Sequence, residues 1–132
     1  CVGFLEEVIF RGLLFEAMRK DGIKSAVIVS SVTFGIGHII NLINGSGAEL
    51  VPNLLQVLYA TAAGFMFVMI YYKTNSLVFC ILHHGTFNAL SVFANESAAT
   101  PEMRLLSCVL LTLISGAYAV YIALTLKRNK NG

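Results

Sequence analysis

The stretch LVPNLLQVLYATAAGFMFVMIYY, residues 50–72, contains no charged side chain. An α-helix needs about 20 residues to cross a hydrocarbon core of about 30 Å. Three further charge-free runs reach this length, at residues 25–48, 74–95 and 105–126. The sequence therefore predicts an all-α fold, a polytopic transmembrane helix bundle.

The composition of the whole chain supports the same conclusion. Of the 132 residues, 57% are hydrophobic and 12% are charged, and the mean hydropathy is +0.78. A soluble domain of this length carries more charge on its surface. The formal net charge of +2 is too small and too scattered for a nucleic-acid surface, so we expect no nucleic-acid partner.

We expect five helices, at residues 2–20, 24–44, 52–72, 76–95 and 101–126. Gly22 is placed to cap the first helix, and Thr100 precedes Pro101 as the N-cap of the last. The sequence Asn-Gly-Ser-Gly at residues 44–47 favours a turn after the second helix.

The chain is expected to form one domain, residues 1–132. It opens at Cys1 without a methionine and continues directly into a helix that contains charged residues, which does not resemble a secretory signal. We therefore expect it to be the C-terminal part of a longer protein.

Lysine and arginine residues are concentrated on one side of the predicted bundle, because they follow alternate helices. One side has Arg19, Lys20, Lys24, Lys73, Lys127, Arg128 and Lys130. The other has Glu49, Glu96, Glu102 and a single arginine, Arg104. The positive-inside rule places the first set in the cytoplasm. The compact domain and short loops favour a bacterial cytoplasmic membrane.

The stretch FLEEVIFRG, residues 4–12, places three charged side chains in an apolar helix. Each charge near the bilayer centre costs about 2.5–3.5 kcal/mol. Glu7 and Arg11 are four residues apart, share one helix face and can pair. Glu6 is rotated by about 100° from Glu7 and is left free to act. The alternative is that all three lie at the membrane surface in contact with water.

Two further segments bring polar groups into apolar helices. FGIGH ends in His38, and HHGTFN contains His84 and Asn88, which share a helix face, whereas His83 points elsewhere. Taken singly, His38 is typical of a packing residue or of a hydrogen bond between helices, while His84 and Asn88 fit a polar clamp between helices as well as a catalytic role. Together with Glu6 they comprise a general base, polarising groups and an oxyanion donor, delivered from three helices.

The three segments resemble an ordered set of family motifs. Glu6, Glu7 and Arg11 match E-E-x-x-x-R, Phe34 to His38 match F-x-x-x-H, and His84 to Asn88 match H-x-x-x-N. This pattern is similar to that of the CAAX-protease and bacteriocin-processing family, also called the CPBP or Abi family. The resemblance extends from Glu6 to Asn88.

The resemblance implies an intramembrane endopeptidase that hydrolyses a peptide or a lipidated protein in contact with membrane lipid. It implies that Glu6 and His38 activate the attacking water, and that His84 and Asn88 stabilise the tetrahedral oxyanion. Glu7 and Arg11 would support the first motif. An oligomeric state does not follow from the sequence.

Several alternatives stay open at this point. His38, His84 and Glu6 offer the ligand types of a zinc site, but the chain has no H-E-x-x-H helix, and we expect a reaction without a metal or another cofactor. A non-catalytic bacteriocin-immunity or peptide-binding membrane protein would keep the same scaffold. A proton-coupled transporter would use the same three residues as a relay, although the repeated halves typical of transporters are not visible.

Overall fold

The computed structural model describes residues 2–44, 49–91 and 99–130, with side chains described as far as residue 126. Within these residues the regular structure is helical and contains no strand, which confirms the all-α prediction. The elements are α1 Val2–Glu7, η1 Val8–Phe15, α2 Glu16–Met18, α3 Ile23–Gly37, α4 Ile40–Ile43, α5 Leu50–Thr74, α6 Leu77–Ser91 and α7 Pro101–Lys130.

The first three elements form one continuous helix that ends at Met18, two residues earlier than predicted. Its middle part, η1, is π-helical, a wider helix that is uncommon and often found at functional sites. The backbone N–H of Gly22 bonds to the Met18 carbonyl at 3.3 Å, and Gly22 has a φ of 157°. The C-terminal cap of this helix is Arg19, however, and Gly22 is the N-cap of α3, so the prediction that Gly22 caps the first helix is wrong.

The second helix is interrupted, and the prediction of one continuous helix over residues 24–44 is wrong. α3 ends at Gly37 and α4 starts at Ile40. At the break, the N–H of His38 bonds to the Gly35 carbonyl at 3.1 Å, a tighter turn than that of an α-helix. Two glycines close to the break explain it, because glycine is about 1 kcal/mol less favourable than alanine in a helix. Residues 45–47 of the predicted turn lie outside the described residues.

The remaining helices start and end close to the predicted positions. α5 is longer than predicted by two residues at each end, and Asn75 ends it in the left-handed conformation with a φ of 51°. α6 starts at Leu77, while its predicted end at residue 95 lies outside the described residues. Thr100 caps α7, since its hydroxyl accepts a bond from the Met103 N–H at 3.3 Å.

The last helix extends beyond its predicted end at residue 126 and reaches Lys130. The prediction stopped where the apolar run stops. Lysine and arginine are good helix formers, and their charge is favourable at a helix C-terminus. Loss of hydrophobicity therefore did not end the helix.

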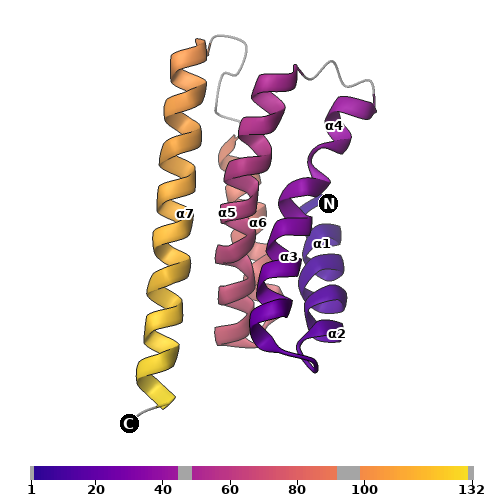
Figure 1. The fold of residues 1–132 in the computed structure, drawn as a ribbon, viewed down its shortest axis with the longest axis vertical. Helices are drawn as coiled ribbons and strands as arrows, with labels where there is room; N and C mark the ends of the chain where they lie inside the picture. The colour runs from indigo at the N-terminus through magenta and orange to yellow at the C-terminus, as the bar shows by residue number, and fades with distance from the viewer. Residues whose placement is uncertain (1, 45–48, 92–98, 131–132) are drawn as a thin grey trace.

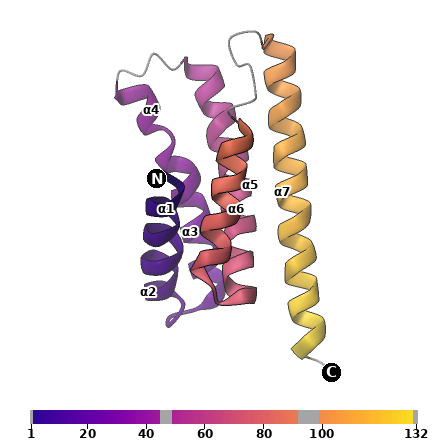
Figure 2. The ribbon, with the colours of Figure 1, turned by 180° about the vertical axis from the view of Figure 1, so that it is seen from behind.

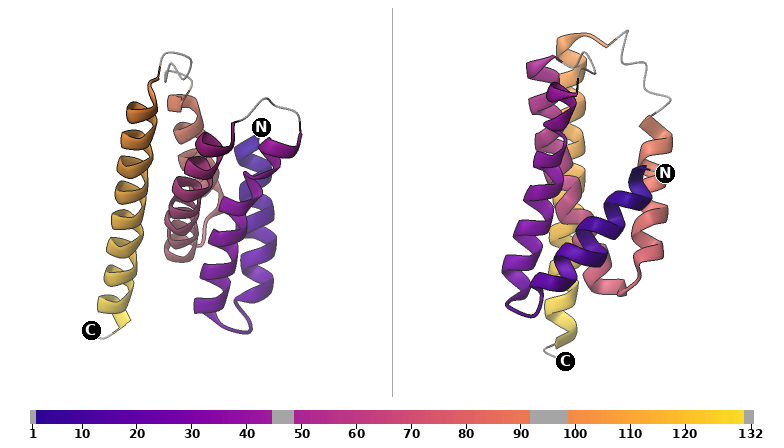
Figure 3. Two further views of the ribbon diagram at one scale, coloured as in Figure 1. Left: turned by 45° about the horizontal axis from the view of Figure 1, so that its top comes forward. Right: turned by 90° about the vertical axis from the view of Figure 1, so that its right-hand side faces the viewer.

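α5 occupies the centre of the bundle, as Figures 1 and 2 show. α3 packs on one side of it and α7 on the other. The first helix and α6 contact each other, and the right-hand view of Figure 3 shows the first helix inclined to the long helices.

Three helical segments of the described chain are long and apolar enough to cross a membrane: Ile23–Ile43, Leu50–Thr74 and Pro101–Leu126. α6 is apolar but short in the part that is described. The outer surface is also apolar, since Leu54 and Leu58 of α5 and Leu113 of α7 are exposed. The protein is an integral membrane protein with a transmembrane helix bundle.

The buried polar side chains lie inside this bundle. Among the described residues they are Glu7, Arg11, Ser30, Ser31, Asn53, His84 and Ser115. A polar interior beneath an apolar exterior suits lipid as the surrounding solvent, because buried polar groups find partners on neighbouring helices.

Two glycines allow α3 and α5 to approach closely. A Cβ atom built on Gly35 would lie 2.8 Å from the backbone N of Thr61, and one built on Gly64 would lie 2.8 Å from the carbonyl oxygen of Ser31. Backbones this close are typical of small-residue contacts in membranes. This contact fixes α5 next to the elements that carry the polar side chains.

The ends of the helices agree with the predicted topology. Figure 1 shows the α2–α3 turn, the α5–α6 turn and the C-terminal end of α7 at the same end of the bundle. Lys24 and Lys73 therefore lie on one side, as predicted. The side chains of Lys127, Arg128 and Lys130, and all of Glu96, lie outside the described residues. The assignment of this end to the cytoplasm stays a prediction.

Candidate active site

Glu7 and Arg11 form the predicted ion pair inside the bundle. Arg11 Nη1 lies 3.1 Å from Glu7 Oε1, and both side chains are 0% exposed. Arg11 Nη2 also donates to the Gly64 carbonyl at 3.0 Å. The guanidinium lies over the Phe34 ring, 4.5 Å from its centroid, a cation–π arrangement. The alternative that this pair lies in contact with water is therefore wrong.

His84 lies beside the same carboxylate. Its Nδ1 is 2.8 Å from Glu7 Oε1, and because a carboxylate only accepts, Nδ1 carries the proton of this bond. The imidazole stacks on Phe67 with the ring centroids 4.7 Å apart and the planes at 20°. Glu7 thus orients the His84 ring and also pairs with Arg11. The sequence predicted only the pairing with Arg11.

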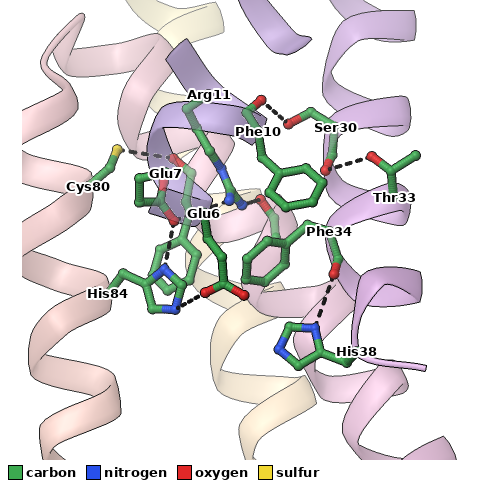
Figure 4. A network of polar contacts seen from close by, with 12 residues as sticks. Glu6, Glu7, Phe10, Arg11, Ser30, Thr33, Phe34, His38, Cys80 and His84 are labelled. Carbon is green, nitrogen blue, oxygen red and sulfur yellow. Dashed lines mark hydrogen bonds and ion pairs between the residues drawn. The ribbon is translucent and has the colours of Figure 1, made fainter. Parts of the chain in front are cut away.

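Glu6 reaches His84 from the other side of the ring. Glu6 Oε2 lies 3.5 Å from His84 Nε2, and the Glu6 side chain is 25% exposed. Figure 4 shows the two neighbouring glutamates at different nitrogens of one imidazole, with Glu7 on Nδ1 and Glu6 on Nε2. Neighbouring positions on a helix point in different directions, which gives the two carboxylates different surroundings.

His38 lies at the break between α3 and α4. Its Nδ1 bonds to the Phe34 carbonyl at 3.1 Å, and because a carbonyl only accepts, Nδ1 carries the proton. In the neutral imidazole, Nε2 is then left as an acceptor. The His38 carbonyl accepts two bonds, one from the Asn41 N–H at 3.2 Å and one from Asn53 Nδ2 at 3.0 Å.

A cavity of about 160 Å³ lies between the predicted catalytic residues His38, His84 and Asn88. It is lined by Phe34, His38, Gln56, Tyr59, Ala60, Ala63, Phe67, His84, Phe87 and Asn88. Three of the four predicted catalytic residues thus line one cavity, and the fourth, Glu6, contacts it through His84. The volume holds several water molecules.

Several residues of the site were missed from the sequence. Asn53 and Gln56 carried a usable signal, because they are polar residues three positions apart in a charge-free run, and Asn53 is 2% exposed. Gly3 is buried, and a Cβ atom built on it would lie 3.3 Å from His84 Cγ. Phe67 and the Gly64 carbonyl gave no signal, since their roles depend on helices far apart in the sequence.

The zinc alternative can be compared with the arrangement of the side chains. The described residues contain no group of three His, Cys, Asp or Glu side chains placed to hold one metal ion. Glu6, His38 and His84 therefore do not form an assembled ligand set. Whether activity depends on a metal stays a matter for experiment.

The comparisons with known proteins give one match. Residues 1–90 match the family described as type II CAAX prenyl endopeptidase Rce1-like. The matched range includes Glu6, His38, His84 and Asn88. No curated protein and no solved structure matches the chain.

Proposed function

Because this chain belongs to the type II CAAX prenyl endopeptidase Rce1-like family, we propose that it hydrolyses a peptide bond inside the membrane with Glu6 as general base. One observation carries this proposal. The cavity that His38, His84 and Asn88 line lies beside a partly exposed carboxylate, that of Glu6, which is 3.5 Å from His84.

In the first step, water in the cavity attacks the carbonyl carbon of the scissile bond. Glu6 takes the proton of this water, and His38 Nε2, an acceptor in the neutral ring, orients the water. The attack forms a C–O bond and moves the carbonyl electron pair onto oxygen.

The resulting oxyanion is stabilised by Asn88 and by His84. Both line the cavity, and the Asn88 amide supplies N–H donors. Because the Nδ1–H of His84 is bonded to Glu7, His84 would donate to the oxyanion through Nε2–H, as an imidazolium. Collapse of the intermediate breaks the C–N bond, and Glu6 returns its proton to the leaving amine. The glutamate is a carboxylate again at the end of the cycle.

Glu7 and Arg11 act as positioning residues. Glu7 holds His84 Nδ1 at 2.8 Å, and Arg11 neutralises Glu7 in a fully buried position. Fixed groups of this kind stabilise a transition state without having to reorganise during the reaction.

The substrate follows from the family description. We propose a membrane-associated protein or peptide with a lipidated C-terminal region, cleaved on the carboxyl side of a prenylated cysteine. The alternative is a peptide without the prenyl group, which would agree with the predicted bacterial cytoplasmic membrane. Two peptides with the same sequence, one farnesylated and one not, distinguish these substrates.

Cleavage of these peptides by the full-length protein in liposomes tests the proposal. The wild-type protein should cleave one of them, and Glu6→Gln should lower the single-turnover rate at least about 100-fold. Glu16→Gln serves as the control, because Glu16 pairs with Arg19 at the surface. If Glu6→Gln cleaved at the wild-type rate, Glu6 would not be the general base. If the wild-type protein cleaved neither peptide, the proposed substrate would be wrong.

The proposal includes a reaction without a metal. The purified protein should keep its activity after dialysis against a chelator, and metal analysis should find less than one equivalent. Activity that is lost on chelation and restored by zinc would instead assign His38 and His84 as ligands.

A further inference from the structure

A second cavity, of about 250 Å³, lies between α5, α6 and α7. It is lined by Ile70, Lys73, Thr74, Phe79, His83, Tyr118 and Ile122, and we call it the lateral groove. It shares none of its described lining residues with the active-site cavity. Phe67 lies between the two, since its ring contacts both His83 and His84.

The lining of the lateral groove is divided by chemistry. Ile70, Phe79 and Ile122 offer an apolar wall, while Lys73 supplies a positive charge. Among the described residues that line the groove, none is acidic, so the charge of Lys73 is not cancelled there. A ligand that fits both parts has an anionic group joined to a hydrocarbon chain.

The position of the groove identifies where such a ligand comes from. Lys73 lies in the last turn of α5, at the end of the bundle that carries Arg19, Lys20 and Lys24. Anionic headgroups gather at the cytoplasmic surface of a membrane, where basic pockets between helices bind them. His83 follows Leu77 by six residues and so lies about 9 Å deeper along α6.

At that depth the groove still contains hydrogen-bond donors. The His83 side chain is exposed at the surface of the bundle, and Tyr118 is 44% exposed. A polar side chain that faces hydrocarbon is costly unless it has a hydrogen-bond partner. The ester oxygens of a glycerophospholipid lie just below the phosphate and can accept from the His83 N–H and the Tyr118 hydroxyl.

We propose that the lateral groove binds an anionic glycerophospholipid. The phosphate lies at Lys73, and the glycerol and ester region extends past Phe79 and Ile122 to His83 and Tyr118, so the acyl chains begin beyond these two residues. This site is distinct from the active site and does not depend on the proposed peptidase activity.

A comparison of two lipids with identical acyl chains tests whether the groove prefers an anionic headgroup. Native mass spectrometry of the full-length, delipidated protein in detergent would compare phosphatidylglycerol with phosphatidylcholine. The wild-type protein should bind phosphatidylglycerol more tightly, and Lys73→Gln should lower that affinity about fivefold. Lys24→Gln should leave it unchanged, because Lys24 is exposed at the same end but does not line the groove.

A second pair of variants tests the apolar wall. Phe79→Ala removes an exposed ring that lines the groove and should weaken the binding of both lipids. Val78→Ala removes a neighbouring exposed side chain that does not line the groove and should weaken neither.

The opposite results would overturn the proposal. Equal binding of the two lipids, or equal effects of Lys73→Gln and Lys24→Gln, would contradict a site for an anionic headgroup at Lys73. Displacement of phosphatidylglycerol by inorganic phosphate would show that the site takes free phosphate and not lipid. Equal effects of Phe79→Ala and Val78→Ala would place the bound lipid outside the groove.

Discussion

Glu7 Oε1 lies 2.8 Å from His84 Nδ1, although 77 positions of sequence separate the two residues. The same oxygen lies 3.1 Å from Arg11 Nη1. A single carboxylate oxygen therefore joins an arginine and an imidazole, and it connects the first helix to α6. The other oxygen, Glu7 Oε2, is buried without a hydrogen-bond partner among the described residues. The carboxylate is thus held from one side only.

Removing the charge of Glu7 should destabilise the protein. Glu7→Gln leaves the Arg11 guanidinium buried, with the Gly64 carbonyl as a remaining acceptor. Loss of one partner of a buried ion pair costs about 3–5 kcal/mol. We expect a lower Tm in detergent and a lower yield, measured by thermal unfolding of the purified variant.

A surface pair in the same helix provides the control. Glu16 lies 2.7 Å from Arg19, and the two side chains are 35% and 36% exposed. Glu16→Gln should cost about 0–1 kcal/mol, because water screens and replaces an exposed pair. If both variants unfold at the same temperature, burial of the Glu7–Arg11 pair does not contribute to stability.

The membrane topology is testable through cysteine labelling. Lys24→Cys and Lys73→Cys should react with a membrane-impermeant reagent from the same side of the membrane, the cytoplasmic one. Glu49→Cys, at the start of α5, should react from the other side. Each variant is made in a background without the native cysteines. Labelling of Lys24→Cys and Lys73→Cys from opposite sides would contradict the arrangement of the helices.

The sequence predicted the features that depend on neighbouring residues. The Glu7–Arg11 pair follows from a spacing of four residues, and the Thr100 cap follows from the Thr-Pro pair at a helix start. The long apolar runs likewise indicated the transmembrane helices. These features depend on helix geometry, which the local sequence determines.

The sequence could not predict the features that depend on contacts between helices. The bond from Glu7 to His84 requires the first helix and α6 to lie side by side, and no spacing along the chain encodes it. The break at His38 was missed because the apolar run continues through it, and the bond from Asn53 of α5 to the His38 carbonyl depends on a contact between helices. The catalytic roles of Glu6, His38, His84 and Asn88 stay predictions.

The close contact between α3 and α5 predicts a second effect on stability. A Cβ atom on Gly64 would lie 2.8 Å from the Ser31 carbonyl oxygen and 3.1 Å from the Ser31 Cα. Gly64→Ala should therefore force two backbones apart and cost about 1–3 kcal/mol, measured by thermal unfolding. Gly116→Ala is the control, because a Cβ atom there meets nothing within 4 Å. An equally small effect of both variants would contradict the close contact.

The last prediction concerns Gly3, where a substitution is expected to change the active site but not the stability of the fold. A Cβ atom built on Gly3 would lie 3.3 Å from His84 Cγ and 3.4 Å from Asn88 Nδ2. Because these contacts are only slightly too short, Gly3→Ala should move the two side chains by a few tenths of an ångström without unfolding the protein.

Displacements of this size affect catalysis more than stability, since reacting groups must be held in a narrow geometry. We expect roughly a tenfold lower kcat for Gly3→Ala with an unchanged Tm, measured by cleavage of the peptide that the wild-type protein accepts. Gly85→Ala is the matched control: Gly85 follows His84 directly, and a Cβ atom there meets nothing within 4 Å. Wild-type activity in Gly3→Ala would mean that the position of His84 and Asn88 does not limit the reaction. Equal losses in both variants would place the sensitivity in α6 itself and not in its contact with the first helix.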